Sequence, residues 1–136
     1  MKHLEQKRAE YALDRIKERS EELQGDNKKR YLNRVKSLPA TIIMCGLGQS
    51  MATLLSVGKG KNESPDQMLY DDVEDWLCNR EGAFYREKNL IEAIVNNDRK
   101  KYVQAQAESL RVLGWLKKFA TAYFSQEVKS DEITTV

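Results

Sequence analysis

The sequence predicts an all-α protein, a single compact bundle of five to seven helices. Apolar residues recur at spacings of three and four along most of the chain, which is typical of helices with one buried face. Alternating strands rich in Val, Ile and Thr and two-residue hairpin turns are absent from the sequence. One uncharged run, residues 37–58, interrupts a chain that is 32% charged. We predict one domain over residues 1–124 and a flexible C-terminal tail over residues 125–136.

The uncharged run is predicted to be the centre of the core. Roughly 20 apolar residues are long enough to cross a bilayer, but polar side chains are spread through this run and Pro39, Gly46 and Gly48 interrupt it. We therefore expect two short helices that meet at a glycine corner. Cys45 is expected to be buried with the apolar side chains of the run, which are Leu38, Ile42, Ile43, Leu47, Met51, Leu54 and Leu55.

Two helices are expected before the corner. The first covers residues 2–23, and Gly25 and Asp26 after it prevent its continuation. The second begins near Lys28, where Asp26 or Asn27 can cap it. Pro39 lacks a backbone donor, so it is expected to kink this second helix or to mark a restart.

Three further helical segments are expected after residue 58. The stretch 58–67 begins as a loop and contains Ser64 followed by Pro65, a typical helix start. The helix that starts there runs to about Arg80. A short segment covers residues 90–95, and the longest helix covers residues 99–125. On the helix after Pro65 the acidic side chains are expected to point mainly outward; they are Asp71, Asp72, Glu74 and Asp75.

Charge is unevenly distributed along the chain. Basic residues exceed acidic ones by four in residues 1–36 and by three in residues 99–136, whereas acidic residues are in excess by seven in residues 63–98. Such a surface can attract polyanions to one side and basic protein surfaces to another. If the second and last helices are neighbours, their cations can form one strip that binds a nucleic-acid backbone; they are Lys28, Lys29, Arg30, Arg34, Lys36, Lys100, Lys101, Lys117 and Lys118.

The residue types argue against an enzyme. His3 is the only histidine, so general acid–base and nucleophilic sites have almost no candidate base. Asp71 and Asp75 stand one turn apart, but acidic helix faces are far commoner than cation sites, so we expect no metal or other cofactor. The N-terminus has no secretory signal, and the two cysteines form no metal or redox pattern, so a reducing, cytoplasmic location is expected without a membrane span.

Trp115 has two open interpretations. It lies between Arg111 and Lys118 on a side of the last helix that its core stripe does not need. It is therefore a candidate for a protein interface, and the trio can also stack on a base and pair with phosphate. Alternatively, a second helix covers it.

Three stretches together resemble a known family. They are LEQKRAEYALDRI in the first helix, LPATIIMCGLGQSMATLLS around the glycine corner, and SLRVLGWLKKFATAY in the last helix. They are similar to the small α-helical subunit of the type III-B CRISPR–Cas effector, the Cmr complex. The resemblance spans residues 4–123, is weakest in the loop 59–64 and is absent from the tail.

The resemblance implies a helical bundle without nuclease activity that serves in antiviral defence. Copies would stack into a filament beside the backbone subunits that hold the CRISPR RNA, and its end would meet the large polymerase-like subunit. Target cleavage would belong to the backbone subunits. By position, the side chains expected to face CRISPR RNA and target RNA are Arg15, Lys28, Lys29, Arg34, Arg111 and Lys118. The expected protein interface consists of Trp115, Asp71, Asp72 and Asp75. The alternative is a free-standing helical adaptor that binds only protein.

Overall fold

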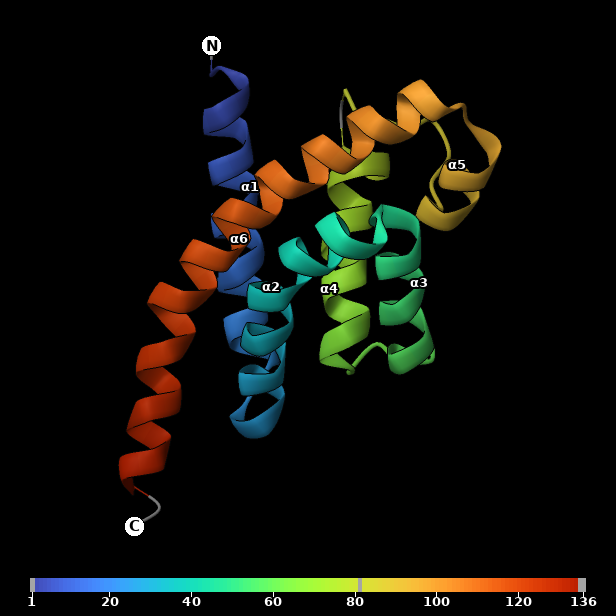
Figure 1. Ribbon diagram of the computed structural model, residues 1–136. Coiled ribbons are helices and arrows are strands. Elements are labelled where there is room, and N and C mark those ends of the chain that lie inside the picture. Colours follow the sequence, from blue (N-terminus) through green and yellow to red (C-terminus); the bar gives the residue numbers. More distant parts are fainter. Residues whose placement is uncertain (1, 81, 135–136) are drawn as a thin grey trace.

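The computed structural model describes residues 2–80 and 82–134, with side chains for residues 2–80 and 82–125 (Figure 1). In this part of the chain there are six α-helices, one π-helical turn and no strand, which confirms the all-α prediction. The elements are α1 (Leu4–Glu22), α2 (Gly25–Cys45), α3 (Leu47–Gly58), α4 (Pro65–Glu74), the π-helical turn η1 (Asp75–Asn79), α5 (Leu90–Asn96) and α6 (Arg99–Thr134).

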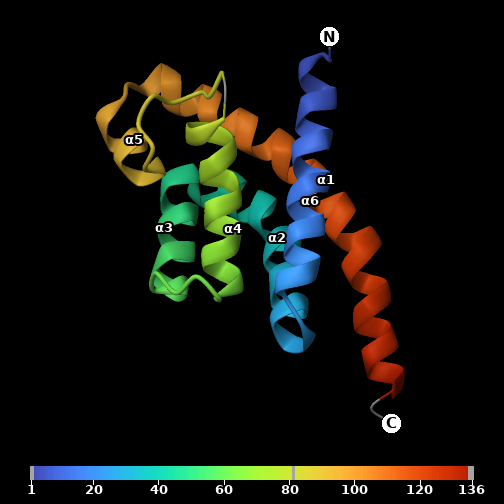
Figure 2. The ribbon, with the colours of Figure 1, turned by 180° about the vertical axis from the view of Figure 1, so that it is seen from behind.

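The long helix α6 lies across one side of the bundle and makes its most extensive contacts with α2 and α1. Seen from behind, α1 runs in front of α6, and α3 and α4 stand side by side (Figure 2). Because α4 also packs against α2, the first turns of α4 face the first half of α2. The largest fully buried side chains come from every α-helix; they include Ile16, Tyr31, Ile42, Leu47, Leu69, Leu90, Leu113 and Phe124.

The central run does form core on both sides of a glycine corner, as predicted. Gly46 has φ of 88°, and Leu38 and Leu47 on its two sides are buried. Two details were wrong, because Ile43 is 70% exposed and Cys45 is exposed. The buried face of α2 contains Leu38 and Ile42, four residues apart, and the residue after Ile42 is turned by about 100° toward solvent. None of the helices in the described residues is long and apolar enough to cross a membrane.

Pro39 lies inside α2, which continues as one helix to Cys45. Of the two expected alternatives the restart is therefore wrong, and the kink stays a prediction. Buried residues occur on both sides of Pro39, so tertiary packing stabilises the helix beyond the missing backbone donor. The start of α2 at Gly25, with Gln24 as N-cap, also precedes the predicted start near Lys28.

The helix that begins at Pro65 agrees with the prediction, and its last turn is π-helical. The backbone of α6 is helical to Thr134, so the predicted end of this helix at Ser125 was wrong. The flexibility predicted for the tail lies partly outside the described residues, because residues 135–136 and the side chains of residues 126–134 are not described. The domain boundary after residue 124 stays a prediction.

Candidate nucleic-acid interface

Two arginines of α2 are anchored on one buried carboxylate of α4. Arg30 and Arg34 lie one helical turn apart and therefore point to the same side of α2. The Nε of Arg30 donates to Oδ2 of Asp66 at 2.9 Å, and the Nε of Arg34 donates to Oδ1 at 2.8 Å. Asp66 is in the first turn of α4, where the positive end of the helix dipole stabilises a carboxylate, and its side chain is 1% exposed.

The arginine side chains themselves remain 48% and 44% exposed. They line an open groove of about 610 Å³ on α2, formed by Asp26, Lys29, Arg30, Asn33, Arg34 and Ser37. The lining has three cations and one carboxylate, and Asp66 beneath it is a second carboxylate, so cations outnumber carboxylates among these residues. A guanidinium has five donors and Asp66 uses one Nε–H of each, which leaves outward-facing donors suited to phosphate oxygens.

A second buried carboxylate, Asp72 of α4, joins three helices. Its side chain is 0% exposed and accepts hydrogen bonds from the guanidiniums of Arg15 and Arg19 at 2.8 and 2.7 Å. The hydroxyl of Tyr31 in α2 donates to Oδ2 at 2.6 Å. The hydroxyl of Tyr11 donates to the backbone oxygen of Asp72 at 2.5 Å. Burial, and then the charge of Asp72, raise the pKa of both tyrosines, so they stay protonated donors.

The model of the CRISPR-associated protein family Cas_Cmr5 matches residues 4–123. The chain belongs to this family. It is therefore a small, helical CRISPR-associated subunit of the type III-B Cmr complex, and it associates with other Cmr subunits. The matched range includes α1 to α5 and most of α6, and it contains both buried carboxylates and the groove on α2.

The six basic residues that were expected to face RNA in this Cmr5 family member have different surroundings. Lys29 and Arg34 lie in the groove on α2. Arg111 and Lys118 are exposed on α6. The other two differ from the expectation, because the guanidinium of Arg15 is 16% exposed and bound to Asp72, and Lys28 is buried with its Nζ 5.4 Å from the centre of the Phe124 ring.

Trp115 combines parts of both interpretations. It is partly buried against the core, its ring stacks on Phe119 at 5.6 Å between ring centres, and its Nε1 donates to Glu5 of α1 at 2.9 Å. Lys118 Nζ lies 5.8 Å from the centre of the indole. The hydrogen bond from Trp115, and then that from Arg8, lower the pKa of Glu5. Trp115 is thus anchored on α1, whereas the arginines of the groove on α2 are anchored on α4. Although α2 and α6 are neighbours, one joint basic strip stays a prediction.

The acidic side chains that were expected to point mainly outward are partly or fully buried. Asp72 is fully buried, so the prediction that it forms an external interface was wrong. Asp71 is half-buried and accepts a hydrogen bond from Gln67 at 3.0 Å, and Asp75 pairs with Arg80 at 3.0 Å. The reason is that α4 lies against α1 and α2, whose arginines reach its carboxylates. The acidic segment thus neutralises cations of its own chain.

The sequence did not lead us to predict that Asp66 and Asp72 hold arginines of other helices in place. A signal was present for both, because Asp66 lies three residues before Leu69, and Asp72 lies three residues after Leu69 and four before Trp76. These spacings place both carboxylates beside the apolar stripe of the helix. The same part of the structure, residues 2–80 and 82–125, contains no group of three His, Cys, Asp or Glu side chains arranged to hold a metal ion.

Proposed function

We propose that this Cmr subunit is non-catalytic and contacts the backbone of guide or target RNA through the groove on α2. The observation that carries the proposal is the pair Arg30 and Arg34, held side by side by Asp66 with nearly half of each side chain exposed. Cations that are oriented before binding lose less conformational entropy when phosphate arrives. Contacts of this kind bind phosphates without reading sequence, which suits a subunit that must accept any guide.

The proposed function also includes assembly. Copies of the chain would stack beside the backbone subunits that hold the CRISPR RNA, and RNA cleavage would belong to those subunits. When weak phosphate contacts are repeated along such a stack, the high effective concentration strengthens binding. A low RNA affinity of each single copy is therefore sufficient. The exposed cations of α6, Arg111 and Lys118, are candidates for further RNA contacts in the assembly. The setting would be antiviral defence in the cytoplasm.

The test is binding of a fluorescent single-stranded RNA, measured by anisotropy at several salt concentrations, to the full chain and to the assembled complex. Each lost phosphate contact should reduce the slope of log affinity against log salt by about 0.7. We therefore expect Arg34→Ala to reduce the slope by about 0.7 and affinity by at least about tenfold, since a hydrogen bond to a charged group contributes about 1.5–3 kcal/mol.

Two further variants distinguish the loss of an RNA contact from misfolding. Arg34→Ala removes a partner of the buried Asp66, whereas Lys29→Ala changes another cation of the same groove and leaves both arginines on Asp66. Lys17→Ala, on the exposed side of α1, is the matched control and should leave the slope unchanged. Unchanged RNA affinity and slope in both groove variants would overturn the proposal. Recovery of Cmr subunits without any RNA would instead favour a protein adaptor.

A further inference from the structure

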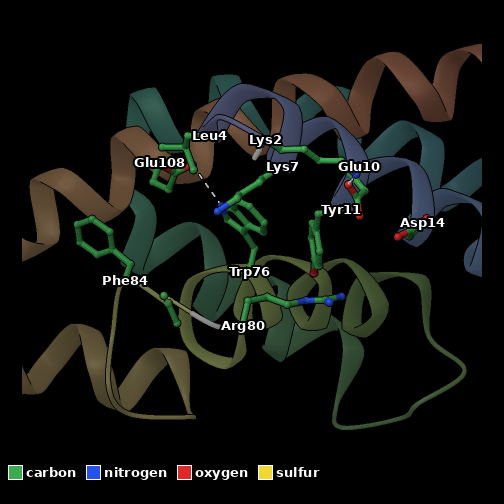
Figure 3. A pocket seen from close by; sticks show the side chains of 12 residues that line it. Lys2, Leu4, Lys7, Glu10, Tyr11, Asp14, Trp76, Arg80, Phe84 and Glu108 are labelled. Carbon is green, nitrogen blue, oxygen red and sulfur yellow. Dashed lines mark hydrogen bonds and ion pairs between the residues drawn. The ribbon is translucent and has the colours of Figure 1, made fainter.

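A second open cleft lies between α1 and the segment around η1, away from the groove on α2. Its volume is about 850 Å³, within the range of about 300–1,000 Å³ that is usual for small-molecule sites. Figure 3 shows its side chains, with Tyr11 beside Trp76 and Phe84 standing apart from Trp76 at one end. The cleft and the groove on α2 have no lining residue in common.

Three aromatic rings form the apolar part of this cleft. The ring centres of Tyr11 and Trp76 are 4.9 Å apart, and Phe84 is a third ring in the lining. The polar atoms of two rings are already bonded inside the protein, because Trp76 Nε1 donates to Glu108 at 3.2 Å and the hydroxyl of Tyr11 donates to the backbone of Asp72. Tyr11 is only 4% exposed, so the partly buried rings of Trp76 and Phe84 are the ones that offer carbon surface to a ligand.

The rim of the cleft is polar, and two of its three cations are ion-paired, Lys2 with Glu10 and Arg80 with Asp75. Lys2, Lys7 and Arg80 belong to the lining, and the Arg80 guanidinium lies 4.6 Å from the centre of the Tyr11 ring. Lys101 Nζ lies 4.5 Å from the centre of the Phe84 ring.

The carboxylates of the lining are largely neutralised by cations of the same chain. Glu108 is held by two hydrogen bonds from Arg8, at 2.7 and 2.8 Å, and Glu10 is paired with Lys2. Asp14 is the third carboxylate of the lining. The lining thus has as many cations as carboxylates, and Lys7 is the lining cation without an ion pair among the described residues.

We propose that this cleft binds the base of a single-stranded nucleotide, stacked on the aromatic rings, with its phosphate near Lys7. Every base has a flat face that stacks on aromatic side chains, and adjacent cations hold the phosphate. A basic side chain of a protein partner fits less well, because Glu10 and Glu108 already have cationic partners. An apolar side chain would leave Lys7 without an anionic partner. This inference adds a base-binding site to the backbone-binding groove and does not depend on that groove.

The chain has two tryptophans, which makes a direct test possible. In the Trp115→Phe variant of the full chain, Trp76 is the only tryptophan and reports on the cleft. Titration with adenosine monophosphate, and then with a short single-stranded RNA, should quench its fluorescence to saturation. In this background Phe84→Ala should weaken the binding at least about fivefold, because it removes a stacking surface.

Charge reversal gives a second readout that leaves the packing of the rings unchanged. Lys7→Glu, at an exposed position on the rim, should weaken binding of the phosphate-bearing probes, whereas adenosine without phosphate should be affected less. The matched control is Lys61→Glu, an exposed lysine in the loop between α3 and α4, which should change nothing. Far-ultraviolet circular dichroism of each variant checks that it is folded.

The outcomes separate this inference from the proposed function. Quenching that is unaffected by Phe84→Ala and Lys7→Glu, or no quenching at all, would overturn the base-binding cleft even if Arg34→Ala still weakens RNA binding. Quenching that disappears in Phe84→Ala supports the cleft even if the groove on α2 proves inactive. Quenching by other Cmr subunits but not by nucleotides would identify the cleft as a protein interface and would also overturn the inference.

Discussion

At the scale of single residues, Asp72 has the largest predicted effect on stability. It has no exposed surface, and Arg15, Arg19 and Tyr31 bond to it from two other helices. Asp72→Asn removes the negative charge and leaves two guanidiniums without their buried partner. We expect it to lower the free energy of unfolding by about 3–5 kcal/mol, as in other buried pairs that lose one member.

Urea unfolding monitored by circular dichroism measures this difference. Asp14→Asn, on the exposed side of α1, is the matched control and should change the free energy by less than about 0.5 kcal/mol. Equal stability of the two variants would show that the network around Asp72 does not stabilise the bundle.

Glu108 should make stability depend on pH in the acidic range. Burial would raise the pKa of this carboxyl, but hydrogen bonds from Arg8 and Trp76 outweigh it, so the pKa in the folded protein is below its ordinary value of 4.5. A carboxyl with a lowered pKa contributes stability above its ordinary pKa, and the contribution is lost as pH falls through the folded-state pKa.

We therefore expect Glu108→Gln to cost about 1.5–3 kcal/mol at about pH 7, because hydrogen bonds to a charged group are lost. The difference from the natural chain should shrink steadily below about pH 4.5. Urea unfolding at a series of pH values tests this. A difference that stays constant down to about pH 3 would mean that the pKa of Glu108 is the same in the folded and the unfolded chain.

At the scale of helices, two glycines are expected to respond to the same substitution with opposite sign. Gly46 forms the corner between α2 and α3 with φ of 88°, and a Cβ there would come within 2.9 Å of the Tyr102 hydroxyl. Gly114 lies inside α6, and a Cβ there would meet nothing within 4 Å.

Gly46→Ala should lower the free energy of unfolding by about 1–3 kcal/mol, since it strains the backbone and displaces Tyr102. Gly114→Ala should raise it by about 0.5–1 kcal/mol, because alanine favours the helix. Thermal unfolding of the two variants compares them directly. Stabilisation by Gly46→Ala would show that this corner does not require glycine.

One helix start with a strong local signal was easier to predict than the course of the helices. Ser64 and Pro65 form a local signal, and the structure confirms a helix that begins at Pro65. The π-helical turn after Glu74 and the extension of α6 to Thr134 were not predicted, and at Pro39 the sequence left a kink and a restart open. At Pro39 the local preference of the backbone opposes the helix, and contacts with α4 and α6 outweigh it.

At the scale of the whole molecule, an exposed apolar end of α2 is a candidate for subunit contact. Met44 is 84% exposed and its neighbour Ile43 is 70% exposed, unusual values for two adjacent large apolar side chains. In the proposed assembly, Met44→Asp should reduce co-purification of other Cmr subunits or further copies, while the free energy of unfolding changes by less than about 0.5 kcal/mol.

Val95→Asp is the control, because Val95 of α5 is 71% exposed and lies on a different helix. Quantitative pull-down with a tagged copy measures the recovery of partners. Equal recovery with Met44→Asp and with the natural chain would exclude this end of α2 as a contact surface. Equal losses in both variants would indicate a general effect of added charge.

The sequence by itself determined the all-α class, the glycine corner and the family, because helical periodicity, glycine and characteristic stretches are local properties of the chain. It also placed Arg34 and Lys29 among the candidates for RNA contact. Only the tertiary structure decided which charges face solvent. Asp66 and Asp72 are neutralised by arginines 32 to 57 positions away in the chain, at hydrogen-bond distance in space. Helical spacing shows on which side of its own helix a residue lies, but the partner on that side depends on how the helices pack.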